Sequence, residues 1–272
     1  MLICQITDLH IKVPGALSYG VVDAAGYLRR CVAHVLALKQ RPDIIVITGD
    51  LVDFGRGEEY AHLAELLQPL TMPVYLLAGN HDDREMLRVS FPAHAYLRQM
   101  DDFIQYAVDA GPLRLLALDS VIPGQSGGEL CDRRIAWLDD RLSEAPDRPT
   151  VILMHHPPFS TGIGHMDQIG FANPADLADI VRRHPQVERI LCGHLHRPIQ
   201  ARFAGTLAST CPGPAHQVAL DLAPDAPSRF VLEPPGYQLH LWGERTGLIS
   251  HTAFIGEFPG PYPFYHDGKL ID

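Results

Sequence analysis

The stretch RPDIIVITGD, residues 41–50, decides how this chain folds. Its centre, Ile44 to Thr48, is almost wholly apolar and β-branched. Such a run predicts a strand that is covered on both faces, as in a sheet flanked by helices. The run ends at Gly49-Asp50, so a carboxylate follows directly on the buried strand. A Gly-Asp pair after a strand is more often a simple turn, and it gains weight only if other strands end in a similar way.

Apolar runs alternate with helical patterns on both sides of this stretch. Strands are expected over residues 2–6, 44–48, 74–78, 103–108, 113–118, 150–154 and 189–192, and helices over 23–40, 58–67, 133–143 and 174–183. Asn173 as N-cap and Pro174 as first helical residue predict the start of the last helix. From Arg197 onward, residues 200–222 and 230–255 indicate strands and turns of an antiparallel sheet. The alternation predicts a layered α/β fold in one domain with a C-terminal, β-rich elaboration.

Composition excludes several classes of protein. The chain has 272 residues, enough for a sizeable core, and a formal net charge of -10, which disfavours DNA or RNA as a partner. No apolar run approaches the length of a membrane-spanning helix. The N-terminus, MLICQITDLH, lacks the features of a signal peptide, so a cytoplasmic location is expected. The five cysteines are scattered and never spaced as CxxC, which argues against a disulfide framework and a zinc-thiolate site.

Four more polar clusters stand where predicted strands end. They are Asp8-x-His10 after residues 2–6, Gly79-Asn80-His81-Asp82 after 74–78, His155-His156-Pro157 after 150–154, and Gly193-His194-Leu195-His196 after 189–192. Each cluster alone has an ordinary explanation as a turn or as a surface histidine. Ligands of open α/β sheets bind outside the carboxyl ends of the strands, so all five clusters are expected at one edge of the sheet. Their joint occurrence indicates a functional site.

The side chains of these clusters suit a pair of divalent metal ions. Carboxylate, imidazole and amide oxygen without thiolate favour Mn, Fe, Co, Ni or Zn. Asp50 is the natural bridging carboxylate; Asp8, His10 and His196 would complete one site, and Asn80, His155 and His194 the other. Two carboxylates and a bridging hydroxide would leave the pair with one net positive charge, which matches a phosphodiester anion. The neutral amide of Asn80 preserves that charge.

Such a centre predicts hydrolysis by a metal-bound hydroxide. Paired metals ~3.5–4 Å apart lower the pKa of bound water and clamp the attacking and leaving oxygens of an in-line displacement. His81 stays outside the ligand set and is the expected catalytic residue, either binding the phosphoryl oxygen or protonating the leaving group. Asp82 or Asp83 either orients His81 or caps the next helix. His156 has either a structural role or a contact with substrate.

The motif order DxH, GD, GNH[DE], a histidine two residues before proline, and GHxH resembles that of the calcineurin-like metallophosphoesterase superfamily. All five motifs are present. The resemblance implies a β-sandwich of two mixed sheets flanked by helices. It implies a catalytic core over residues 1–200, followed over 201–272 by strands that complete the sandwich and an extended arm. Within HHPP it selects His155, rather than His156, as the ligand.

The segments RPDIIVITGD, GRGEEY, GNHDD, MHHPP, ERILCGHLH and STCPGPAHQV, with Tyr19-Gly20, resemble bacterial glycerophosphodiesterases and class III cyclic-nucleotide phosphodiesterases. The similarity spans about residues 1–220. It implies two divalent ions of mixed identity, Fe and Mn first and Co or Zn as alternatives. It also implies that His216 reaches the substrate pocket beside His81 and Asn80, and that the C-terminal region forms oligomers and covers the site.

Three functions remain open from the sequence. The leading hypothesis is a dinuclear metal-dependent phosphodiesterase acting on glycerophosphodiesters or 3',5'-cyclic nucleotides. A phosphomonoesterase could use the same centre, and a scaffold could keep the fold without the chemistry, although the intact ligand set argues against that. The absence of a basic stripe disfavours a nuclease, so a small phosphodiester, and neither a nucleic acid polymer nor a membrane, is the expected partner.

Two segments stay ambiguous. Residues 159–171, FSTGIGHMDQIGF, form either an apolar cover over the pocket or a packing loop. The tail GEFPGPYPFYHDGKLID is either a disordered end or an arm that makes subunit contacts, the latter predicting a homo-oligomer, dimer or higher.

Overall fold

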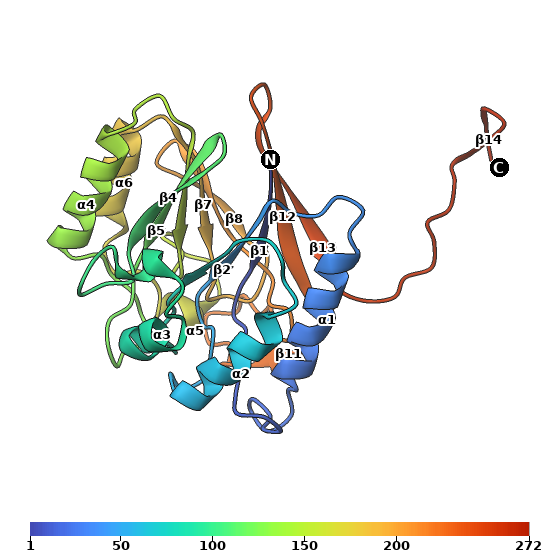
Figure 1. The fold of residues 1–272 in the computed structure, drawn as a ribbon, viewed down its shortest axis with the longest axis horizontal. Coiled ribbons are helices and arrows are strands. Elements are labelled where there is room, and N and C mark those ends of the chain that lie inside the picture. Colours follow the sequence, from blue (N-terminus) through green and yellow to red (C-terminus); the bar gives the residue numbers. More distant parts are fainter. Residues whose placement is uncertain (272) are drawn as a thin grey trace.

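The computed structural model describes residues 1–271 and has two sheets packed face to face, with helices on the outer faces (Figure 1). The first sheet has the order β13-β12-β1-β2-β3. Its strands are β1 (Leu2–Ile6), β2 (Ile44–Thr48), β3 (Val74–Leu77), β12 (Gly236–Gly243) and β13 (Gly247–Phe254). The first three run parallel to one another, while β12 pairs antiparallel with both β1 and β13.

The second sheet has the order β4-β5-β6-β7-β9-β8. Its strands are β4 (Tyr106–Ala110), β5 (Leu113–Leu118), β6 (Thr150–Met154), β7 (Val187–Cys192), β8 (Gln200–Phe203) and β9 (Thr206–Thr210). Four central strands run parallel, and the edge strands β4 and β8 pair antiparallel. The predicted architecture of two mixed sheets flanked by helices is therefore confirmed.

Four longer helices cover the sheets. On one side lie α1 (Ala24–Ala37) and α2 (Gly57–Leu67), and on the other α4 (Asp132–Ser143) and α6 (Pro174–Arg183) (Figure 1). All four were predicted, although α1 ends at Ala37 rather than at residue 40. The sequence did not predict three short elements, α3 (Arg84–Ser90), η1 (Ala95–Arg98) and α5 (Gly164–Asp167), because helices of so few residues show no apolar periodicity.

Alternating side chains of the strands fill two separate layers. In β6, Val151 and Leu153 belong to the core between the two sheets, whereas Ile152 and Met154 pack with residues of α4 and α6. This period of two explains why β6 is apolar on both faces, since both faces are covered.

Two local expectations need correction. The strand predicted over 103–108 starts only at Tyr106, because the carboxylate of Asp119 accepts the N–H of Ile104 at 2.8 Å and holds that segment outside the sheet. Asn173 occupies the N-cap position of α6 but does not cap it. Its side chain instead accepts from the N–H of Leu130 at 3.0 Å and donates to the same residue's carbonyl at 2.7 Å.

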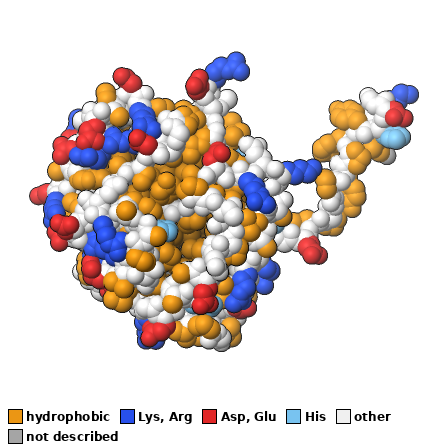
Figure 2. Space-filling view, viewed as in Figure 1, with side chains coloured by type: hydrophobic (Ala, Val, Ile, Leu, Met, Phe, Trp, Pro, Cys, Tyr) orange, Lys and Arg blue, Asp and Glu red, His pale blue; other side chains and the backbone are white. Residues whose placement is uncertain are grey.

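The C-terminal segment adds to the first sheet and then leaves the body. Short pairs form between β10 (Gln217–Val218) and β11 (Phe230–Val231), and between β14 (Tyr265–His266) and β15 (Lys269–Leu270). After β13 the chain projects as an exposed arm on which hydrophobic side chains gather (Figures 1 and 2). Within residues 1–271, the helices are all too short or too polar to span a bilayer.

Candidate metal centre

Five strand ends meet at the edge of the sheets where α5 and β11 lie in Figure 1. They bring together all seven predicted ligands: Asp8, His10, Asp50, Asn80, His155, His194 and His196. Oδ2 of Asp50 lies 3.3 Å from Nε2 of His155 and 3.6 Å from Nε2 of His10. Asp50 is therefore central, in contact with residues of both proposed metal sites.

The backbone at this edge is held in a conformation that L-residues avoid. Positive φ values occur at Asp8 (55°), His10 (47°), Asp50 (47°), His194 (71°) and His196 (52°). Each costs on the order of 1–2 kcal/mol relative to an ordinary region. Five of the seven predicted ligands therefore have a strained backbone, which lowers the stability of the fold and directs their side chains inward.

Two glycines let the loops approach closely. Gly49 has φ +94°, and a Cβ placed there would lie 2.4 Å from Nδ1 of His155. A Cβ on Gly79 would lie 2.3 Å from the backbone N of Asp50. Both positions thus require glycine, because any side chain would displace a predicted ligand.

Hydrogen bonds to outer residues determine which ring nitrogen of each histidine faces inward. His155 donates through Nδ1 to the carbonyl of Thr48 at 2.8 Å, and His196 through Nδ1 to the carbonyl of His216 at 3.1 Å. The Nδ1 of His10 lies 3.2 Å from the carboxylate of Asp53. Each ring therefore turns its Nε2 toward the centre. Orientation by such outer partners is typical of metal-ligating histidines.

His194 differs from these three rings. Its Nε2 lies 3.2 Å from the carbonyl of Ile169, which leaves Nδ1 as the available lone pair. Its backbone N–H donates to Oδ1 of Asp8 at 3.0 Å, so the GHLH turn is tied directly to the first strand end.

Several inward-facing atoms have no hydrogen-bond partner within residues 1–271. They are Oδ2 of Asp8, Oδ1 of Asn80 and Nε2 of His155, all shielded from solvent. Nε2 of His10 and Nε2 of His196 face each other at 3.2 Å. Buried polar atoms without partners are costly, and a cation among them would satisfy every one. The donor set of carboxylate, amide oxygen and imidazole fits a pair of divalent ions.

The electrostatics of the centre also favour bound cations. Burial raises the pKa of Asp8 to about 6, despite the opposing charge of His155. Burial also acts to raise the pKa of Asp50, but the neighbouring His155 holds it well below the usual value. In turn Asp50 raises the pKa of His155 to about 9 against the effect of burial. Asp50 thus stabilises positive charge at His155, and a bound metal ion would supply that charge in place of a proton.

A cavity of about 390 Å³ opens over this centre. His81, Asn80 and His216, the predicted substrate-binding residues, all line it. His81 donates through Nδ1 to the carbonyl of Asp53 at 2.9 Å, and its backbone N–H donates to Oδ1 of Asp50 at 2.9 Å. Its Nε2 is left for a ligand in the cavity. Burial lowers the pKa of His216 to about 3, so that ring is neutral.

Three other predicted residues lie outside the cavity. Asp82 does not contact the ring of His81. Its carboxylate accepts from Gly79 N at 2.8 Å, Leu51 N at 3.0 Å and the Tyr60 hydroxyl at 2.9 Å, which ties two ligand loops together. Asp83 caps α3, accepting from Met86 N at 2.8 Å.

His156 is buried, and both of its ring nitrogens are in use. Nδ1 lies 2.8 Å from Oγ of Ser120, and Nε2 lies 3.1 Å from the carbonyl of Ser126. Because the ring makes these two contacts and does not line the cavity, it connects the loop after β5 to the pocket wall.

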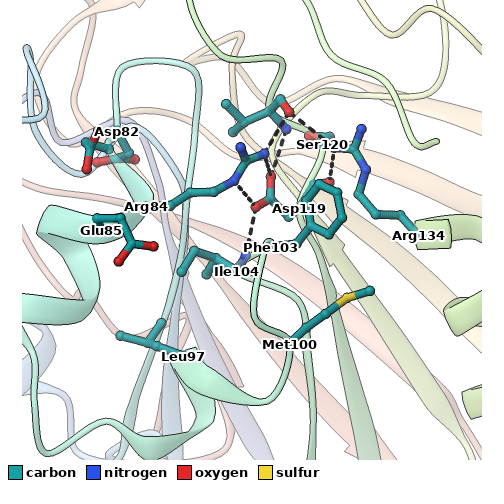
Figure 3. A network of polar contacts seen from close by, with 12 residues as sticks. Asp82, Arg84, Glu85, Leu97, Met100, Phe103, Ile104, Asp119, Ser120 and Arg134 are labelled. Atoms are coloured by element: carbon teal, nitrogen blue, oxygen red, sulfur yellow. Dashed lines mark hydrogen bonds and ion pairs between the residues drawn. The ribbon is translucent and has the colours of Figure 1, made fainter.

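Sequence patterns missed several residues that hold the site in place. Asp53 bonds His10 and also pairs with Lys12 at 3.0 Å; its place three residues after Asp50 was the only available signal. Figure 3 shows Arg84 and Asp119, which form a bidentate ion pair with distances of 2.6 and 2.9 Å. This pair fixes the start of α3, directly after the GNHDD loop, against the end of β5.

Comparison with known proteins agrees with this geometry. Residues 1–198 match the model of the calcineurin-like phosphoesterases. The chain is 41% identical over 277 residues to a probable glycerophosphodiester phosphodiesterase of Arcobacter nitrofigilis, covering 100% of both chains. It is 31% identical over 259 residues to a 3',5'-cyclic adenosine monophosphate phosphodiesterase of Escherichia coli, covering 92% of this chain and 90% of that one.

Solved structures share the fold. A dimetal phosphatase from Danio rerio superposes with a TM-score of 0.64 at 17% identity, covering 94% of this chain and 99% of that one. A purple acid phosphatase from yellow lupin gives a TM-score of 0.67 at 14% identity, covering 100% of this chain and 52% of that one. These likenesses concern the fold alone.

Proposed function

The chain belongs to the calcineurin-like phosphoesterase family, as its motifs predicted, and on that premise we propose that it is a dinuclear metal-dependent phosphodiesterase. Its substrates are small phosphodiesters, either glycerophosphodiesters or 3',5'-cyclic nucleotides, as the names of its relatives in Arcobacter nitrofigilis and Escherichia coli indicate. The observation that carries the proposal is the convergence of buried ligand atoms on Asp50: Oδ2 of Asp8 and Oδ1 of Asn80 have no hydrogen bond within residues 1–271, and Nε2 of His155 lies beside Asp50.

The proposed ligand sets follow from which atoms face inward. Asp50 would be shared by the two ions. Asp8, His10 and His196 would hold one ion with it, and Asn80, His155 and His194 would hold the other. Iron and manganese are the first candidates, with cobalt or zinc as alternatives, since all are accommodated by oxygen and imidazole ligands.

Bound divalent ions would supply positive charge for the phosphoryl oxygens and lower the pKa of water at the site. The protein's own contribution is orientation and proton transfer. His81 is held by the Asp53 carbonyl and by the bond from its backbone to Asp50, so its Nε2 points into the cavity. We assign it the role of stabilising the phosphoryl oxygen or protonating the leaving alkoxide.

Hydrolysis of a defined panel tests this function. The protein, reconstituted with Mn or Co, is assayed with cyclic AMP, glycerophosphoethanolamine, bis(p-nitrophenyl) phosphate and p-nitrophenyl phosphate. Preference for a diester supports the proposal and identifies the substrate class. Faster turnover of the monoester would assign the chain to the phosphomonoesterases. No turnover of any compound, with two metals bound per chain, would support the scaffold reading instead.

Compartment and assembly are also proposals. All five cysteines are free, which accords with a reducing compartment such as the cytoplasm. The arm exposes Phe258, Tyr262 and Phe264, at 63%, 75% and 80% of their surfaces, and none of its residues lines the cavity of its own chain. We propose that it contacts another copy of the chain. Light scattering before and after truncation at residue 256 tests this, and an unchanged mass would contradict it.

A further inference from the structure

The wall of the cavity that β10 and β11 form carries one formal charge. This wall is formed by His216, Val218 and the segment 228–230, and its cation is Arg229. Among the described residues that line the cavity, Arg229 is the only lysine or arginine, and Asp50 is the only acidic residue. Asp50 belongs to the metal centre, so Arg229 is the one lysine, arginine or acidic residue of the described lining that lies outside that centre.

The backbone of Arg229 is fixed while its guanidinium is free. Its carbonyl accepts from Ala219 N at 2.9 Å, and the next residue, Phe230, pairs with Val218 between β11 and β10. Within residues 1–271 the guanidinium has neither a hydrogen bond nor an ion pair. By contrast, Arg84 pairs with Asp119, and Arg197 pairs with Glu233. Lys12, close in sequence to His10, pairs with Asp53 at 3.0 Å.

The aromatic rings beside Arg229 pack on one another. Tyr19, His216 and Phe230 have ring centroids 5.1–5.4 Å apart in all three pairs. Rings at that spacing are in contact with one another. The trio therefore forms a packed wall and has no gap between its rings that would enclose a quaternary ammonium group on several sides.

We infer that Arg229 selects the substrate by the charge on its alcohol arm, so that the preferred diesters carry a neutral or anionic arm and those with an ammonium or trimethylammonium arm are disfavoured. The inference rests on the proposed phosphodiesterase function and narrows its substrate class. A cationic arm would meet the guanidinium with no acidic residue to offset it, and exclusion by like charge is an effective source of specificity. A polyol arm could accept hydrogen bonds from the same group.

The expected size of the effect is modest because Arg229 is exposed. At separations of about 6–8 Å in a solvent-accessible pocket, a unit charge changes the ratio of affinities by about three- to tenfold. The preference should shrink toward unity at 1 M salt, where the Debye length is only about 3 Å.

The test compares two glycerophosphodiesters that differ in the charge of one arm, glycerophosphoglycerol and glycerophosphocholine. Dissociation constants from calorimetry on the metal-loaded protein and kcat/KM values are measured for both. The wild type should favour glycerophosphoglycerol about three- to tenfold, Arg229→Lys should keep the preference, Arg229→Gln should abolish it, and Arg229→Glu should reverse it. Arg245→Gln, in the exposed turn between β12 and β13, makes the same change in net charge away from the cavity and should leave the ratio unchanged.

Four results would overturn the inference. The wild type could bind both diesters equally, prefer the choline ester, or bind neither of them, or Arg229→Gln could leave the ratio of dissociation constants unchanged. Failure of the proposed function looks different. It would appear as absence of turnover for every diester, while the ratio of dissociation constants still reports on Arg229.

Discussion

Replacing Asp119 by alanine should be among the most damaging single changes outside the metal ligands. Asp119 is fully buried at the end of β5, and its carboxylate accepts four hydrogen bonds. Two come from Arg84, one from Ile104 N at 2.8 Å and one from Val121 N at 3.0 Å (Figure 3). Alanine would leave a guanidinium that is only 15% exposed without its counter-ion, and two backbone N–H groups without acceptors.

The magnitude follows from these losses. Removing one partner of a buried ion pair costs about 3–5 kcal/mol, and each unsatisfied N–H adds about 1–3 kcal/mol if water cannot reach it. Arg84 retains a bond to the carbonyl of Val121 at 2.8 Å and has partial access to solvent, so the terms do not add in full. We expect Asp119→Ala to lower the free energy of unfolding by about 4 kcal/mol. Asp119→Asn keeps an acceptor oxygen and should lose about half as much.

Urea unfolding, followed by circular dichroism and tryptophan fluorescence, measures the change. The protein is first treated with chelator, because bound metal would add its own stabilisation. Asp179→Ala is the matched control: Asp179 pairs with Arg182, but the two side chains are 68% and 60% exposed, so the loss should stay below about 0.5 kcal/mol. A loss below about 1 kcal/mol for Asp119→Ala, or one equal to that of Asp179→Ala, would refute the reasoning.

Three further predictions concern the centre and a buried histidine. His81→Ala should lower kcat by about 10²–10⁴-fold with metal content by mass spectrometry unchanged, and a loss of metal would mean that His81 is a ligand. Gly49→Ala should reduce the number of metal ions bound per chain, because its Cβ would lie 2.4 Å from His155. Gly205→Ala is the control: it has a similar φ of +96° but open space around the Cβ, so it should only lower stability, by about 1–2 kcal/mol. Burial, with the charge of Arg189, lowers the pKa of His240 to about 3. As the pH falls from 6 to 4, the wild type should therefore lose stability faster than His240→Gln, by about 1 kcal/mol per pH unit. The sign follows because the unfolded chain takes up the proton below about pH 6.5; parallel acid-unfolding curves would exclude it.

The sequence was most informative where strands are covered on both faces. The bounds expected for β1, β2, β5 and β6 match the structure, because these strands are mostly apolar runs that end at turn residues or polar clusters. Pairing between distant strands carries no comparable signal. Leu2 lies opposite Leu241 in β1 and β12, and nothing in either run specifies the other. The arrangement as two packed sheets therefore came from resemblance to a family, not from periodicity.

The candidate site was accessible from sequence only at its strand ends. Residues that follow a strand directly are placed by topology, which is why all seven predicted ligands converge. Residues that act through contacts with distant parts of the chain cannot be placed in this way. Asp119 stands at a strand end as well, yet its role depends on Arg84 at the start of α3, and no local pattern indicates that the two residues meet.

The two adjacent histidines of HHPP differ in their hydrogen bonds. In HHPP both residues have the same chemistry, and spacing alone does not say which one faces the centre. The ring of His155 uses only Nδ1, on the carbonyl of Thr48, and keeps Nε2 near Asp50. The ring of His156 uses both nitrogens, on Ser120 and Ser126. A metal ion needs a free lone pair, so the hydrogen bonds alone favour His155 as a ligand and give His156 the task of holding the wall of the pocket. His156→Gln should therefore keep the metal content and weaken substrate binding, whereas His155→Gln should lose metal; equal loss of metal in both variants would contradict this division.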